Sequence, residues 1–209
     1  MFPSISRMFR VPQPLRADAQ ASAARPHVFG IGLPKTETTT LGAALARLGY
    51  RVRDFDREAL FAVAGGDVEA ALWRAEAYHA FEDSPWWMVY RELDLRFPGS
   101  LFILTERRDE EAWRQSGVKH LARATGGILD PVAATFVGHF ARLGVAPDRQ
   151  HEAYAFHGRA VRAHFAGRES QFRVLNWDRG DGWPELCGFL GVPAPSGLPF
   201  PHENAAPLQ

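Results

Sequence analysis

The sequence has little cysteine and no net charge. Among its 209 residues the one cysteine, Cys187, has no intramolecular disulfide partner and cannot build a thiolate metal cluster. Disulfide-stapled secreted domains and zinc fingers are therefore excluded, and a cytoplasmic location is expected. Lys plus Arg (24) equal Asp plus Glu (24), so no overall field favours nucleic acid as a partner. Any anion site must be built locally.

Long hydrophobic runs are also lacking. A bilayer span needs about 20 apolar residues, and no segment approaches that length, so stable membrane insertion is not expected. Residues 1–26 hold four prolines, which break any long helix, and we interpret them as an N-terminal extension. The hydrophobic content of 46% with 23% charged residues is typical of a folded chain. Residues 27–209 are predicted to form a single domain.

Apolar runs typical of buried strands alternate with helical patterns along that domain. Strands are predicted at 27–32, 51–53, 79–83, 101–105 and 172–176. Helices are predicted at 41–48, 57–64, 67–78, 84–95, 110–123, 131–143, 150–166 and 183–190, with Pro85 in the first turn of its helix. This alternation predicts an α/β fold: three layers around a mostly parallel sheet. Ligands then bind at the carboxyl ends of the strands.

The segment after the first strand has the form of a phosphate-binding loop. A strand that enters a glycine-containing loop and then a helix directs backbone N–H groups and the positive helix end at one point. Lys35 is one of only two lysines in the chain, which points to a specific role. A kinase-type P-loop requires glycine directly before this lysine, and Pro34 stands there instead. Thr38, Thr39 and Thr40 offer further hydroxyl donors at the helix start.

Three ordered segments resemble the sulfotransferases that use 3′-phosphoadenosine 5′-phosphosulfate (PAPS). Residues 32–41 resemble the 5′-phosphosulfate loop of that family. Residues 101–105, followed by Arg108 and Ser116 eight positions apart, resemble its 3′-phosphate motif. Residues 182–193, with 200–204, are similar to the C-terminal GWxxLCxFLGVP signature of one bacterial and eukaryotic branch. The resemblance implies transfer of a sulfuryl group from PAPS, without a metal, to a hydroxyl or amine of a small-molecule or glycan acceptor.

The resemblance also implies roles for individual residues. Lys35 would contact the leaving phosphate, and Asp83, in an Asp-x-Pro pattern at a strand end, would take the acceptor proton; His79, Glu82 and His120 compete with it. Arg107 is an alternative to Arg108 if the strand ends one residue earlier. The residues expected to bind PAPS are Gly32, Pro34, Lys35, Thr36, Glu37, Thr38, Thr39, Thr40, Arg108 and Ser116.

One residue departs from the family pattern. Family members usually carry glycine where this chain has Glu37, because the loop passes close to phosphate and uses a positive φ. A carboxylate there is expected to repel the ligand unless it pairs with an arginine. Two alternatives stay open: a P-loop kinase acting on a small molecule, and a nucleotide-binding protein that has lost catalysis. The acceptor and the oligomeric state are not predicted by the sequence.

Overall fold

The structure is a computed structural model that describes residues 25–124 and 130–203, apart from the side chains of 118–124. Its strands form one sheet in the order β2-β3-β1-β4-β5, and all pairs are parallel. This confirms the α/β prediction. The strands are β1 (Val28–Gly30), β2 (Val52–Arg53), β3 (Ala80–Phe81), β4 (Leu101–Thr105) and β5 (Phe172–Leu175).

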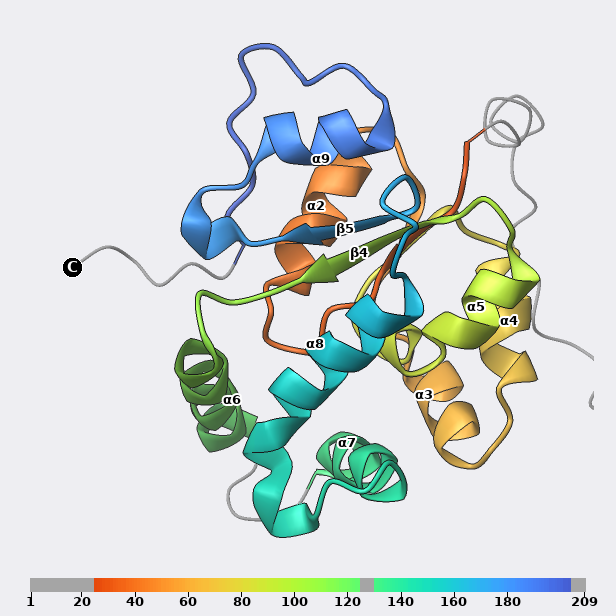
Figure 1. The fold of residues 1–209 in the computed structure, drawn as a ribbon, viewed down its shortest axis with the longest axis vertical. Coiled ribbons are helices and arrows are strands. Elements are labelled where there is room, and N and C mark those ends of the chain that lie inside the picture. Colours follow the sequence, from red (N-terminus) through yellow and green to blue (C-terminus); the bar gives the residue numbers. More distant parts are fainter. Residues whose placement is uncertain (1–24, 125–129, 204–209) are drawn as a thin grey trace, which may run out of the picture.

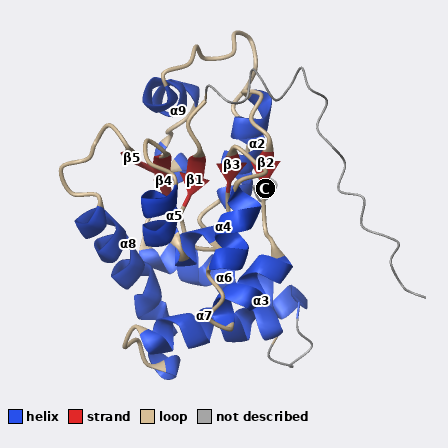
Figure 2. Ribbon diagram, turned by 90° about the vertical axis from the view of Figure 1, so that its right-hand side faces the viewer, coloured by secondary structure: helices blue, strands red, loops and turns tan. Residues whose placement is uncertain are grey.

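Helices cover both faces of the sheet, which gives three layers (Figures 1 and 2). On one face lie α2 (Thr38–Arg47) and α9 (Trp183–Leu190). The opposite face carries a thicker layer of α3 (Arg57–Ala64), α4 (Glu69–Ala75), α5 (Tyr90–Arg96), α7 (Pro131–Arg142) and α8 (Ala153–His164). Helix α6 (Glu110–Ala124) lies beyond the arrowhead of β4 in Figure 1. Three short 3₁₀ helices complete the described elements: η1 (Trp86–Met88), η2 (Pro147–Glu152) and η3 (Trp177–Arg179).

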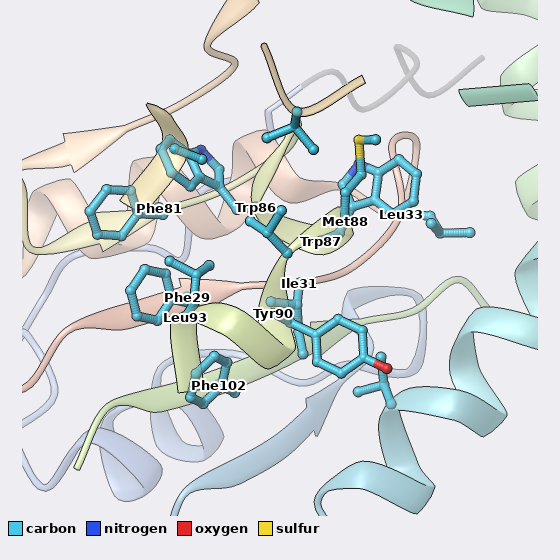
Figure 3. Packing of buried hydrophobic residues seen from close by; sticks show 14 of the residues in the cluster. Phe29, Ile31, Leu33, Phe81, Trp86, Trp87, Met88, Tyr90, Leu93 and Phe102 are labelled. Atoms are coloured by element: carbon cyan, nitrogen blue, oxygen red, sulfur yellow. The ribbon is translucent and has the colours of Figure 1, made fainter. Parts of the chain in front are cut away.

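The central strands are buried on both faces, which explains their nearly continuous apolar sequences. Along β1 and β4, alternate residues enter different cores: Val28 and Ile103 face α2 and α9, whereas Phe29 and Phe102 face the thicker layer. The rings of Phe29 and Phe102 stack with centroids 5.3 Å apart, and Figure 3 shows both among the buried aromatic side chains of this face. Each such burial contributes about 1.5–3 kcal/mol, so β1 is fixed between two cores.

The segment 84–95 differs from its prediction as one helix beginning at Pro85. A cis Ser84–Pro85 bond and the 3₁₀ helix η1 come first, and α5 begins only at Tyr90. Residues 86–89 are all buried, which one amphipathic α-helix could not achieve with a solvent-facing side. The indole N–H groups of Trp86 and Trp87 donate to the Asp54 carbonyl and the Ser84 hydroxyl. Packing of the two tryptophans therefore overrides helical periodicity.

Two other helix predictions are too long. The predicted helix 67–78 extends only over α4, and the predicted helix 150–166 divides into η2 and α8. Most of the N-terminal extension lies outside the described residues. Of its last two residues, Arg25 donates to the Leu48 carbonyl at 3.0 Å. Within the described part of the chain, no helix is long and apolar enough to cross a membrane.

Candidate functional site

The strand order creates a topological switch point at the edge of the sheet that is formed by the carboxyl ends of its strands. From the central strand β1 the chain passes to β2 and β3 on one side, and then to β4 and β5 on the other. The connections that leave the carboxyl ends of β1, β3, β4 and β5 therefore meet at this edge, where open α/β sheets bind ligands. These connections carry Lys35, Asp83, Arg107 and Asp178.

Gly32 and Thr36 join the loop after β1 to the end of β4. A Cβ atom on Gly32 would lie 2.0 Å from Oγ1 of Thr105 and 2.7 Å from its carbonyl oxygen, so only glycine fits. The Thr36 and Thr105 hydroxyls are hydrogen bonded at 2.6 Å, and Thr36 Oγ1 also donates to the Leu33 carbonyl at 2.7 Å. The predicted loop glycine and threonine thus anchor the loop through packing and hydrogen bonding.

Two further carbonyl groups of the loop are bound by side chains from distant helices. His157 of α8 lies 2.8 Å from the Ile31 carbonyl through Nε2. Burial lowers the pKa of His157 to about 4, so the ring is neutral, and Nε2 carries the hydrogen because a carbonyl can only accept. The indole of Trp113 in α6 donates to the Pro34 carbonyl at 2.8 Å. These oxygens, which would repel an anion, are therefore turned into the protein.

The N-terminus of α2 has no side-chain cap. Glu37 occupies the cap position with φ 62° and makes no capping hydrogen bond within the described structure. The first N–H groups of a helix otherwise lack intrahelical partners and attract an anion. The Thr40 hydroxyl accepts the Glu203 N–H at 3.2 Å, whereas Thr39 is exposed. The hydrogen-bond donors at this helix start are therefore mainly backbone N–H groups, and less the predicted hydroxyls of Thr38, Thr39 and Thr40.

Lys35 and Asp83 come from neighbouring connections, and both have left-handed backbones, with φ 73° and 65°. Burial raises the pKa of Asp83, while the Ser84 N–H, which donates to Asp83 Oδ1 at 2.6 Å, and the charge of Lys35 lower it. A cation and a half-buried carboxyl group are thus brought together beside the uncapped helix. Such a pair can stabilise developing negative charge and accept a proton.

The alternatives to Asp83 lie in different places. His79 precedes β3 and is therefore at the opposite edge of the sheet from Lys35. Glu82 follows β3, as Asp83 does, but is only 4% exposed. The side chain of His120 lies outside the described residues. Asp83 is therefore the competing group whose position best fits proton transfer at this edge.

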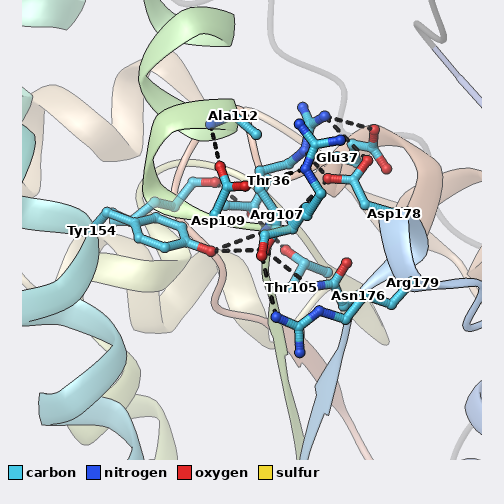
Figure 4. Close-up of polar contacts among 12 residues, drawn as sticks. Thr36, Glu37, Thr105, Arg107, Asp109, Ala112, Tyr154, Asn176, Asp178 and Arg179 are labelled. Carbon is cyan, nitrogen blue, oxygen red and sulfur yellow. Dashed lines mark hydrogen bonds and ion pairs between the residues drawn. The ribbon is translucent and has the colours of Figure 1, made fainter.

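The carboxylate of Glu37 lies beside an arginine (Figure 4). Its Oε1 is 3.7 Å from Nη2 of Arg107. The same guanidinium binds Asp178 through Nε at 2.7 Å and Nη2 at 3.2 Å. Burial raises the pKa of Glu37; the Arg107 charge opposes this rise and Asp178 adds to it. Arg107 therefore offsets part of the cost of a carboxylate at this position.

Arg107 and Arg108 face different surroundings. Arg107 is 19% exposed in its side chain, and its backbone N–H and carbonyl contact the Tyr154 hydroxyl at 3.0 and 3.2 Å. The Arg108 side chain is 68% exposed and lies 3.2 Å from Asp109. Ser116 is partly exposed on α6. Arg108 is thus directed to solvent, while Arg107 holds the connections together.

His157, Asp178 and Tyr154 were not identified from the sequence. Asp178 lies in η3, shortly after β5, so the rule that strand ends gather at one edge was the signal available for it. No local pattern marks His157 or Tyr154, because both act from α8 across the fold. Four tryptophans are buried, and the half-buried Trp113 reaches the loop. The described residues contain no cluster of three or more His, Cys, Asp or Glu side chains able to hold a metal ion.

The chain is similar to known proteins in sequence and in fold. A family model described as a sulfotransferase domain matches residues 27–207. The chain belongs to the sulfotransferase family. The crystal structure of a sulfotransferase from Alicyclobacillus acidocaldarius is similar in fold, with a TM-score of 0.55 and 19% sequence identity over 88% of this chain and 87% of that chain. A search of curated proteins gives no match.

The left-handed backbone at Glu37 can be tested with two substitutions. Both Glu37→Gly and Glu37→Ala remove the ion pair with Arg107, but only alanine keeps the cost of φ 62° for a residue with a Cβ atom. We expect the glycine variant to be more stable than the alanine variant by about 1 kcal/mol. Urea unfolding measures the difference. Equal stabilities would contradict a left-handed residue 37.

Proposed function

We propose that this sulfotransferase uses PAPS as its donor and transfers the sulfuryl group to a hydroxyl or amine of a small-molecule or glycan acceptor. The observation that carries the proposal is the loop at 31–37, where side chains bind the carbonyl oxygens of Ile31, Leu33 and Pro34 beside Lys35 and an uncapped helix. We also propose a cytoplasmic location, in keeping with the single cysteine, and membership of the branch defined by the motif at 182–193.

The loop fits the 5′ end of PAPS, which supplies an activated sulfuryl group next to a phosphate. Backbone N–H groups at the start of α2 bind its oxygens, with Gly32, Pro34 and Thr36 shaping the loop. Lys35 supplies positive charge that matters most as negative charge grows on the phosphate. Arg107 lies 3.7 Å from the Glu37 carboxylate and offsets part of its repulsion of the ligand.

Arg108 and Ser116 fit the 3′ phosphate. The exposed Arg108 guanidinium is available for a bidentate contact once it leaves Asp109, and Ser116 lies two turns along α6. Arg107 is less suitable because Asp178 binds it through two nitrogens. These positions favour the register in which Arg108 contacts the nucleotide.

Asp83 is proposed as the base. Its carboxylate, which lies within the field of the Lys35 charge, accepts the proton of the acceptor hydroxyl or amine. Its raised pKa increases its strength as a base, while Lys35 keeps it from being neutralised. This assignment requires no covalent intermediate on the protein.

The donor class is tested by thermal shift with 3′-phosphoadenosine 5′-phosphate (PAP). PAP, with or without Mg²⁺, should raise the melting temperature more than Mg-ATP at equal concentration, because it presents phosphates to both motifs. Equal or greater stabilisation by Mg-ATP would favour the kinase alternative. Binding of PAP without turnover on any acceptor would favour a nucleotide-binding protein that has lost catalysis.

Two neighbouring arginines provide a matched pair for the 3′ site. Arg108→Ala should weaken PAP binding by about 2 kcal/mol, or roughly 30-fold, because it removes a charged hydrogen-bond donor. Binding of adenosine 5′-phosphosulfate, which has no 3′ phosphate, should be almost unchanged. Arg107→Ala should instead lower protein stability through loss of Asp178's partner. Reversal of these two patterns in calorimetry would move the 3′ contact to Arg107.

Lys35→Ala and Asp83→Asn should separate binding from chemistry. The lysine substitution should lower kcat by about 100-fold or more, with a smaller effect on PAP affinity. The asparagine substitution should lower kcat by about 100-fold or more and leave PAP affinity unchanged. Transfer of labelled sulfate to an acceptor identified among phenols, sugars and amines measures both, with exposed Asp148→Asn as the control. Unchanged turnover in Asp83→Asn would exclude Asp83 as the base.

A further inference from the structure

Glu82 is a buried acid that the proposed reaction does not use. It follows β3, is 4% exposed, and lies beneath helix α2. A Cβ atom on Gly42 would come within 3.1 Å of Glu82 Oε1, and one on Gly30 would come within 3.3 Å of Glu82 Cβ. The side chain is therefore packed between β1 and the first turns of α2.

The surroundings of Glu82 disfavour a negative charge. Its Oε2 atom is buried and has no hydrogen-bond partner among the described residues. Burial, and then the charge of the adjacent Asp83, raise the pKa of Glu82 to about 7, against the opposing effect of a hydrogen bond from the Thr38 side chain. Asp54, from the connection after β2, also raises it. An unpartnered carboxylate oxygen in such a place is costly, whereas a neutral acid is tolerated.

Thr38 connects Glu82 to the anion site. It is the first residue of α2, so its backbone belongs to the uncapped helix start while its side chain contacts Glu82. An anion at the helix start and an ionised Glu82 would be two like charges on either side of one residue. In a poorly solvated region such repulsion is much stronger than in water. Occupation of the loop therefore favours the protonated form of Glu82.

We propose that Glu82 takes up a proton when an anionic nucleotide binds to the loop at 31–37. The proposal rests on the proposed function for its ligand, PAP, and adds a protonation step to binding. One proton from solvent neutralises the Glu82 carboxylate as the nucleotide phosphate enters, and no bond forms between Glu82 and the ligand. Above neutral pH, nucleotide affinity then falls because Glu82 must be protonated first.

The test compares wild type with Glu82→Gln, which resembles the protonated acid in shape. Calorimetric titration with PAP at about pH 8, in buffers of different ionisation enthalpy, should show net proton uptake by wild type and its loss in the variant. Wild-type affinity should weaken by up to about tenfold per pH unit above 7, whereas Glu82→Gln affinity should change much less. Titration of the PAP phosphates is common to both proteins and cancels in the comparison. Asp54→Asn, which removes an exposed acid that raises the pKa of Glu82, should keep the proton uptake and shift it to slightly lower pH.

A ligand-free measurement gives a second, independent readout. Because the pKa of Glu82 is raised in the folded state from 4.5 to about 7, Glu82 contributes most to stability below about pH 4.5, and this contribution falls as pH rises toward 7. The fall should be smaller in Glu82→Gln. Equal proton uptake, or equal pH dependence of stability, in the two proteins would overturn the proposal.

Failure of PAP to bind at any pH has a different meaning. It would refute the proposed function, and the comparison would then use inorganic sulfate as the anion. Weakening of sulfate binding with rising pH in wild type but not in Glu82→Gln would still support proton uptake by Glu82. The same pH dependence in both proteins would overturn it.

Discussion

The contact between the loop after β1 and the end of β4 is the constraint on which the site depends. Gly32 leaves room for Thr105, and the hydrogen bond between Thr36 and Thr105 closes the contact at 2.6 Å. Since β1 lies between two hydrophobic cores, the loop begins from a fixed point. Side chains of α6 and α8 can then bind its carbonyl groups, and the N–H groups at the start of α2 point in a fixed direction. Preorganised donors of this kind need no rearrangement when charge develops.

Backbone strain is concentrated at the same edge. Among the described residues, the non-glycine residues with positive φ are Lys35, Glu37 and Asp83, and all three follow β1 or β3 at the site. A left-handed backbone costs about 1–2 kcal/mol per residue, so the surrounding contacts must hold it. For Asp83 the Ser84 N–H does this, and for Glu37 the Arg107 charge contributes. The strained residues place Lys35 near Asp83 and Glu37 near Arg107.

The charged groups around the site are arranged about Arg107. Arg107 is held by Asp178 and lies near Glu37, so it joins three connections of the sheet edge (Figure 4). Although burial opposes it, the Arg107 guanidinium and the Arg108 N–H hold the pKa of Asp178 below its usual value. The exposed Arg108 is then the arginine directed to solvent. Below the loop, the buried Glu82 makes the charge state of the site depend on pH.

The sequence by itself determined the parallel α/β architecture, the loop at 32–40 and the strand-end positions of Lys35 and Asp83, because strand periodicity and glycine placement are local properties. It did not determine the path of residues 84–89, where burial of Trp86 and Trp87 replaces a regular helix start. The sequence also did not distinguish Arg107 from Arg108, since two adjacent arginines differ only in the residues that they contact in the folded protein. Contacts from Asp178, 71 positions away, and from His157 on α8 decided which groups hold the site together. Such contacts are formed by tertiary packing, and no pattern within one segment can specify them.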